Sequence, residues 1–166
     1  MGPMRATLSL LLLLATLCAC SSRPRPEPIV LTLQRADTGG RYRFEERRAD
    51  ATIVYFFSTW CVLCQAMEPF VAEAARQGRR EGIEVVGVAL DADGAKLVRP
   101  YVLATEPPYP VLLGGTEVAE GRTLFGRIPE LPSVMFLDSE GRPSAVMTGL
   151  VETEALLEQA REVSGR

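Results

Sequence analysis

The chain contains no histidine. This absence excludes imidazole-based acid–base catalysis, Ser–His and Cys–His nucleophile pairs, and copper, zinc or haem sites that need histidine ligands. The 166 residues also include only one tryptophan and four cysteines. Few side chains are therefore left that could carry chemistry, and the cysteines are the first candidates.

Charge of either sign is also modest and evenly spread. The net charge is -3, and charged residues make up 23% of the chain against 47% hydrophobic residues. This composition predicts one globular domain with a sizeable core. It lacks the basic surface that nucleic acid binding requires, so we expect no nucleic acid partner.

The N-terminus predicts an export signal. A short basic start precedes the apolar run ATLSLLLLLATL, which is too short to span a membrane. Leu17-Cys18-Ala19-Cys20 then resembles a bacterial lipobox, which implies cleavage before Cys20 and lipidation of that residue. An uncleaved anchor and a plain signal peptide are the alternatives. We predict a lipoprotein signal peptide over residues 1–19, then a lipidated Cys20 and a proline-rich tether over residues 20–28.

The four cysteines divide into two groups. Cys18 leaves with the signal peptide and Cys20 carries lipid, so Cys61 and Cys64 alone remain in the folded part. A disulfide closing so short a loop restrains little of the unfolded chain, which argues against a purely structural bond. Zinc needs four ligands, and the chain has neither a second CxxC nor a histidine. Redox chemistry is the favoured interpretation, with a structural disulfide as the alternative.

Hydrophobic patterning predicts an α/β fold with a mixed sheet. A continuous run of apolar, β-branched and aromatic residues at 51–57 is typical of a strand buried on both faces, and residues 83–90 predict another buried strand. Turn residues at 38–40 and 139–141 each predict a pair of strands around them. Helices are predicted at 61–80 with a kink at Pro69, at 95–104, at 116–126 with Gly121 in its middle, and at 151–163.

The position of the cysteine pair suits disulfide exchange. Cys61 follows a predicted buried strand and opens a predicted helix, where free N–H groups and the helix dipole stabilise negative charge. Such a position can lower a thiol pKa from ~8.5 to between ~3.5 and ~7.5, and the thiolate is the form that attacks. Cys64, one turn along, can reach back to release the mixed disulfide. We expect Cys61 to be the exposed nucleophile and Cys64 the more buried resolving residue.

Two stretches carry a family resemblance. Trp60-Cys61-Val62-Leu63-Cys64, followed by Pro69, resembles the active-site helix of thioredoxin-fold proteins. Leu131-Pro132-Ser133, with the strand-turn-strand pattern after it, resembles the cis-proline segment of the same fold. The resemblance implies a thioredoxin-like domain over residues 29–166, with Pro132 as a cis-proline facing the cysteines. It also places Leu131 against the substrate, and Trp60 is expected there because it adjoins the nucleophile.

Within this fold the chain resembles the TlpA/ResA-type exported thiol-disulfide oxidoreductases. The similar stretches are the N-terminal hairpin, FFSTWC, GIEVVGVALDAD, and the helix and strand that end in YPVLLGG. The resemblance implies a mixed central sheet flanked by helices, with an N-terminal β-hairpin and an extra helix–strand insert. It implies no metal and no cofactor other than the redox-active disulfide of Cys61 and Cys64.

Three positions depart from the family pattern. Val62-Leu63 separates the cysteines, where the family usually has proline before the second cysteine. Tyr55 stands where thioredoxin has a buried acid, and Met67 where many ResA-like proteins have glutamate. Glu68 follows Met67 and is a candidate for proton transfer only if the kink in the helix turns it inward. We favour the alternative, a solvated glutamate. The group that moves protons to and from the cysteines stays open.

The leading functional hypothesis is a membrane-tethered oxidoreductase that reduces protein disulfides outside the cytoplasm. The family resemblance implies a membrane electron donor that reduces the cysteine pair by thiol-disulfide exchange. It also implies cytochrome c maturation as one process in which the protein could act. Ser21 after the lipidated cysteine slightly favours the outer over the inner membrane. The alternatives are a disulfide oxidant or isomerase, a copper(I)-binding carrier that uses the two thiolates, and a peroxiredoxin-type peroxidase.

Overall fold

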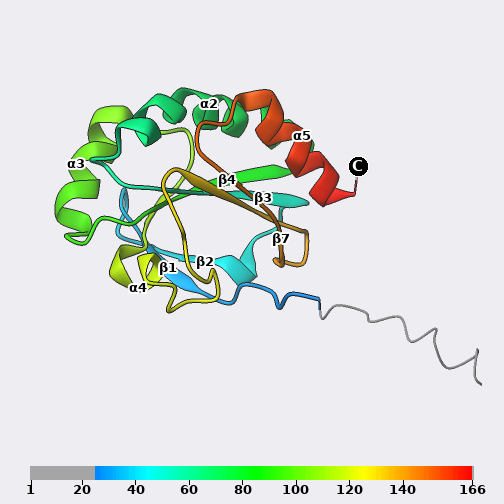
Figure 1. The fold of residues 1–166 in the computed structure, drawn as a ribbon, viewed down its shortest axis with the longest axis horizontal. Helices are drawn as coiled ribbons and strands as arrows, with labels where there is room; N and C mark the ends of the chain where they lie inside the picture. Colours follow the sequence, from blue (N-terminus) through cyan, green and yellow to red (C-terminus); the bar gives the residue numbers. More distant parts are fainter. Residues whose placement is uncertain (1–24, 166) are drawn as a thin grey trace, which may run out of the picture.

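A computed structural model describes residues 25–165 of the chain (Figure 1). The predicted signal peptide, the predicted lipidation site Cys20 and the first residues of the predicted tether lie outside the described residues. In the described part of the chain, no helix has both the length and the apolar composition needed to cross a membrane.

The centre of the described domain is a seven-stranded mixed sheet, which confirms the predicted fold class. Its strand order is β2-β1-β5-β4-β3-β6-β7. β3, β4 and β5 run parallel, whereas the other neighbouring strands pair antiparallel. The strands are β1 (Thr32–Arg35), β2 (Arg41–Arg43), β3 (Ala51–Phe57), β4 (Ile83–Ala89), β5 (Val111–Leu113), β6 (Ser133–Leu137) and β7 (Pro143–Thr148).

The helices follow the predicted order, and one of them is shorter than predicted. Over residues 25–165 they are α2 (Val62–Gly78), α3 (Ala95–Thr105), α4 (Gly115–Ala119) and α5 (Thr153–Ser164), with 3-10 turns η2 (Phe44–Glu46) and η3 (Arg79–Glu81). The predicted helix over 116–126 is wrong in extent. Gly121 has a φ of 72°, and a Cβ there would lie 2.9 Å from Arg127 Cα. The chain therefore turns back on itself at this glycine and cannot continue as a helix.

Two apolar layers cover the two faces of the sheet. Side chains alternate along β3, so Ile53, Tyr55 and Phe57 pack on one face with α2, α3 and α5, whereas Val54 and Phe56 pack on the other with α4 and η2. Figure 1 shows α2 and α5 above the sheet and α4 below it. Every β3 side chain is buried, so this strand holds the start of the loop between β3 and α2 in a fixed position.

The two ends of β3 have different surroundings. Its carboxyl end leads into the cysteine pair, and there Phe56 pairs with Ser133, the first residue of β6. At its amino end, Thr52 pairs with the last β6 residue, Leu137. The turn after β6 then accepts a hydrogen bond from the backbone N–H of Ile29 to Gly141 O at 2.8 Å. The chain thus joins the domain at the end of the sheet opposite the cysteines.

The packing around β4 leaves no room for a side chain at Gly87. A Cβ on this residue would lie 3.0 Å from Tyr109 Cε2 and 3.3 Å from Phe57 Cε1. We expect Gly87→Ala to lower the free energy of unfolding by about 1–3 kcal/mol through overpacking, as measured by urea denaturation. Gly40→Ala is the control, because a Cβ there would meet only the exposed Thr38 hydroxyl, at 3.3 Å. We expect it to change stability by less than about 0.5 kcal/mol. Equal effects of the two changes would contradict this account.

Candidate functional site

The cysteine pair lies where β3 passes into α2. Cys61 is the N-cap residue of α2, and its Sγ accepts a hydrogen bond from the backbone N–H of Cys64 at 3.1 Å. The Cys61 N–H donates to Ser58 O at 3.1 Å, which closes the turn that leads into the helix. The two sulfurs form a disulfide, with 5.2 Å between the Cα atoms. The first sulfur is therefore held against the free N–H groups of a 17-residue helix.

The two cysteines differ in how far solvent can reach them. Cys61 retains 8% exposure and Cys64 2%, so Cys61 is less open in the disulfide form than expected but remains the more accessible of the pair. Around them Trp60 and Val62 are 71% and 78% exposed, and Leu63 is 44% exposed. A partner that reaches Cys61 must therefore lie against apolar side chains.

The second predicted segment lies at the same end of the sheet. The Leu131–Pro132 peptide bond is cis, the geometry that the resemblance implied. Because Ser133 pairs with Phe56, Pro132 lies level with the carboxyl end of β3, from which the cysteine loop starts. Leu131 is partly buried and packs against both core layers. The structure thus brings Leu131 and Pro132 to the carboxyl end of the sheet with Trp60 and the cysteines.

A buried carboxylate holds the loop before the cysteines, and sequence reasoning missed it. Asp91 is 1% exposed and follows the carboxyl end of β4. It accepts hydrogen bonds from Thr59 Oγ1 at 2.6 Å and from the Thr59 backbone N–H at 3.1–3.2 Å. The signal available in the sequence was its position, since the carboxyl ends of neighbouring parallel strands meet at one end of a sheet. Asp91 is a positioning residue for the loop that carries Cys61.

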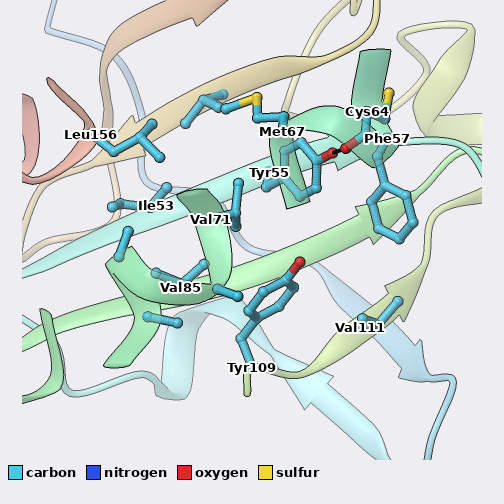
Figure 2. Close-up of a cluster of buried hydrophobic side chains, with 14 of the residues drawn as sticks. Ile53, Tyr55, Phe57, Cys64, Met67, Val71, Val85, Tyr109, Val111 and Leu156 are labelled. Atoms are coloured by element: carbon cyan, nitrogen blue, oxygen red, sulfur yellow. Dashed lines mark hydrogen bonds between the residues drawn. The ribbon is translucent and has the colours of Figure 1, made fainter. Parts of the chain in front are cut away.

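Behind the disulfide, a tyrosine takes the place of the acid found in thioredoxin. Tyr55 Oη donates a hydrogen bond to the carbonyl oxygen of Cys64 at 2.9 Å (Figure 2). Burial raises the pKa of Tyr55 well above its ordinary value, so the group stays a neutral hydroxyl. It anchors the first turn of α2 and does not act as a carboxylate would.

The expectation that Glu68 is solvated is wrong. Glu68 is partly buried, and its Oε2 accepts a hydrogen bond from Tyr109 Oη at 2.6 Å. Residues four apart lie on one side of a helix, so Glu68 shares the inward side of α2 with the buried Cys64. Burial raises the pKa of the Glu68 carboxyl, although the Tyr109 hydrogen bond opposes the shift. Figure 2 shows Tyr109 beneath the same cluster as Tyr55 and Cys64. The sequence alone could not place Tyr109, 41 residues away, beside this helix.

The same cysteines are the only thiol groups in the described domain. Over residues 25–165, no three His, Cys, Asp or Glu side chains gather as a metal site would need. Two thiolates could bind copper(I) when reduced. The disulfide form has no free sulfur for a metal.

The Asp91 contact yields the first prediction for the site. Asp91→Ala should lower the free energy of unfolding by about 1–3 kcal/mol, because it removes the partner of the half-buried Thr59 N–H and hydroxyl. In a double-mutant cycle, Thr59→Val should be much less damaging in the Asp91→Ala background than in the wild type. Additive losses in urea denaturation would show that the two residues act separately.

Glu68 and Glu73, both on α2, should affect the pH dependence of stability with opposite sign, because folding raises the pKa of the first and lowers that of the second. The folded state binds the Glu68 proton more tightly than the unfolded chain, so this residue lowers stability as pH rises above its ordinary value of 4.5. Glu68→Gln keeps an acceptor for Tyr109 and should gain stability over the wild type between pH 4.5 and 8. The control is Glu73→Gln, because hydrogen bonds from Gln77 and Arg76 lower the pKa of exposed Glu73. That variant should be less stable than the wild type by a nearly constant amount above pH 4.5, and the difference should shrink as the pH falls below 4.5. Urea denaturation at several pH values measures both variants. A Glu68→Gln effect that does not vary with pH would rule out a buried carboxyl.

Comparison with known proteins assigns this geometry to a family. The thioredoxin family model matches residues 41–122, which include both cysteines. ResA of Bacillus thuringiensis subsp. konkukian, a thiol-disulfide oxidoreductase, is 25% identical over 128 residues, or 76% of this chain and 70% of ResA.

Solved structures agree on the fold. A thioredoxin family thiol:disulfide interchange protein from Chlorobium tepidum has a TM-score of 0.72 at 23% identity, over 88% of this chain and all of that one. A secreted thiol-disulfide isomerase from Corynebacterium glutamicum has a TM-score of 0.75 at 16% identity, over 88% of this chain and 90% of that one. With the cysteine pair and the ResA similarity, the chain belongs to the thioredoxin-fold thiol-disulfide oxidoreductases.

Proposed function

We propose that the protein reduces disulfides of other proteins outside the cytoplasm, with Cys61 as the nucleophile and Cys64 as the resolving residue. The observation that carries this proposal is the contact between Cys61 Sγ and the Cys64 N–H at the N-terminus of α2. In the reduced protein, the same N–H groups would stabilise a Cys61 thiolate. The higher exposure of Cys61 supports the same order of attack.

The chemistry transfers two electrons from the cysteine pair to the substrate. The Cys61 thiolate attacks one sulfur of the substrate disulfide, which forms a mixed disulfide and releases the other substrate sulfur as a thiolate that takes up a proton. Cys64 then loses its proton and attacks Cys61 Sγ. This step forms the Cys61–Cys64 disulfide and frees the second substrate thiol. A dithiol donor reduces the pair again by the reverse exchange.

Glu68 is our candidate for the group that accepts the Cys64 proton. It lies one helical turn after Cys64 on the inward side of α2, and burial raises the pKa of its carboxyl toward neutral pH. Tyr109 fixes the carboxyl through its hydroxyl. In this proposal, Glu68 takes over the proton-transfer role of the acid that the family carries at other positions.

Substrate contact is assigned to the apolar surface at the end of the sheet. Trp60, Val62 and Leu63 are exposed beside the disulfide, and Leu131 and Pro132 lie at the same end of β3. Such a surface suits an extended or unfolded chain, because it offers apolar contact without a deep pocket. In our proposal, Trp60, Leu131 and Pro132 hold the substrate chain while Cys61 attacks.

Location and partners follow from the N-terminal pattern. We place the protein on the extracytoplasmic side, lipid-anchored through Cys20, with the outer membrane slightly favoured and a membrane thiol donor as the source of electrons. The lipobox-like sequence supports the anchor, and a similar structure is that of a secreted protein. Cytochrome c maturation is one setting in which such a reductant would work.

Trapping of the mixed disulfide tests the order of attack. Cys64→Ser should accumulate covalent complexes with disulfide-bonded substrate proteins, because the step that releases them is lost. Cys61→Ser is the matched control and should form none. Non-reducing gels measure both variants, and complexes formed through Cys64 in the Cys61→Ser protein would reverse the proposed roles.

The reduction potential tests the direction of electron flow. Trp60 lies next to the disulfide and is the only tryptophan, so its fluorescence should follow the redox state in dithiothreitol or glutathione buffers. A potential near or below about -250 mV would support a reductant, whereas one near about -120 mV would indicate an oxidant or isomerase. Retention of one copper per reduced chain against a chelator would support the copper(I) carrier instead.

A further inference from the structure

A cavity lies at the end of the sheet opposite the disulfide. It is a cavity of about 590 Å³ beside the amino ends of β4 and β5, with β2 and the segment after η2 along its sides. This volume is within the range of small-molecule sites in proteins. The redox chemistry proposed above does not use it.

Five arginines line this cavity. Arg41 and Arg43 come from β2, Arg47 and Arg48 from the segment after η2, and Arg79 from η3. Among the ion pairs of residues 25–165, only that of Arg43 with Glu46 involves any of the five. Four guanidinium groups that form no ion pair in the described domain thus surround one hollow, in a chain whose net charge is -3.

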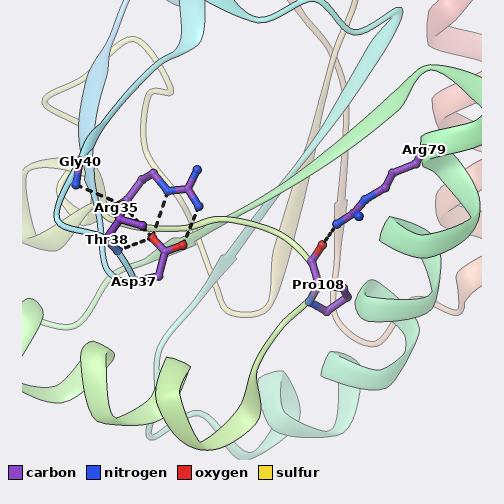
Figure 3. Close-up of polar contacts among 6 residues, drawn as sticks. All are labelled: Arg35, Asp37, Thr38, Gly40, Arg79 and Pro108. Atoms are coloured by element: carbon purple, nitrogen blue, oxygen red, sulfur yellow. Dashed lines mark hydrogen bonds and ion pairs between the residues drawn. The ribbon is translucent and has the colours of Figure 1, made fainter.

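Two of these arginines are fixed in place by uncharged acceptors. Arg79 donates to the backbone carbonyl of Pro108 in the loop before β5, as Figure 3 shows. Arg47 donates to Thr52 Oγ1 at 2.8 Å, Phe44 O at 3.1 Å and Asp138 O at 2.6 Å. These contacts orient the guanidinium groups, and none of them is an ion pair. Such an arrangement is preorganised for an anion.

Two acidic residues, Glu46 and Glu84, also line the cavity, and they are too few to neutralise the five arginines. Glu46 is engaged by Arg43 at 2.7 Å. Burial raises the pKa of Glu84, although Tyr42 and Arg47 oppose the shift, so burial disfavours its negative charge. The lining holds five arginines against these two glutamates, so its net charge is positive even when both carboxyls are ionised.

The size of the cavity and its apolar residues suit an organic anion better than a small inorganic ion. The volume equals that of about twenty water molecules, and apolar walls come from Ala75, Ile83, Val85, Pro108 and Pro110. The buried hydroxyl of Tyr42 faces Glu84 in this lining, although the two groups do not meet in hydrogen-bonding geometry. An anionic group for the arginines, joined to an apolar portion for these walls, would satisfy both parts of the lining.

The cavity also lies close to the point where the chain joins the domain. Arg47 bonds the carbonyl of Asp138 in the turn after β6, and the same turn accepts the N–H of Ile29 through Gly141 O. The described residues that precede Ile29 run past this turn, where Arg25 lies beside Asp138 and the C-terminal end of α5. If that segment is anchored in a membrane, phospholipid headgroups lie within its reach.

We propose that this arginine-lined cavity binds the phosphate group of an organic phosphate, supplied either by a soluble compound or by a phospholipid headgroup. Arginine suits phosphate because its planar fork of donors matches two phosphate oxygens. The apolar walls hold the group to which the phosphate is attached. The site works independently of the disulfide and of the proposed direction of electron flow.

The test uses the full chain and two probes, phenyl phosphate and a short-chain phosphatidylglycerol that stays monomeric in water. The variant is Arg41→Gln with Arg48→Gln, since both side chains are exposed and neither forms an ion pair. The control is Arg99→Gln with Arg127→Gln, two exposed arginines outside the lining, which changes the net charge equally. Titration calorimetry measures binding, and redox cycling of the disulfide checks that each variant is folded.

We expect the cavity variant to weaken phenyl phosphate binding at least about tenfold, the control to change it less than about twofold, and added salt to weaken it in the wild type. Arginine-dependent binding of phosphatidylglycerol as well would assign the phospholipid headgroup as the source. Binding of phenyl phosphate alone would assign a soluble phosphate. The proposal is overturned if neither probe binds saturably into the millimolar range, or if both double variants lose binding equally.

Discussion

The contact on which this protein depends is that between the sulfur of Cys61 and the first turn of α2. A sulfur placed there meets unpaired N–H groups, so the chain's only disulfide in the described domain sits in a field that favours negative charge. The contact holds because β3, buried along its whole length, fixes the start of the loop. Asp91 fixes its middle from the neighbouring strand. The reactive group is thus defined by the packing of residues that take no part in the reaction.

The sequence was sufficient for the parts of the fold that local patterns encode. The apolar run of β3 predicted a strand buried on both faces, and the CxxC after it predicted the start of a helix. The long-range side-chain contacts were not predictable in this way. Tyr109 meets Glu68, and Asp91 meets Thr59, only because distant segments are brought together by the sheet. The prediction of a solvated Glu68 failed for this reason, since the sequence of α2 does not show that Tyr109 lies beside it.

The two ends of the parallel strands are chemically different. The carboxyl end combines apolar exposed side chains with the sulfur chemistry, whereas the amino end combines arginines with a hollow. Tyr109 connects the two, because it lines the hollow and its hydroxyl reaches Glu68 on α2. The three parallel strands of the sheet thereby separate a surface suited to protein chains from one suited to small anions.

The hydrogen bond from Ile29 to Gly141 places the start of the domain at the end of the sheet opposite the disulfide. For a chain held by its N-terminus, the seven residues of β3 would stand the disulfide about 20 Å further out than the point of attachment. The reactive end would then face away from the supporting surface. Proteins free in the surrounding space could approach it directly. A donor embedded in that surface would have to extend upward to the disulfide, or the tether would have to let the domain tip over. The distance of the disulfide from the supporting surface would thus give substrate proteins easier access to it than an embedded electron donor.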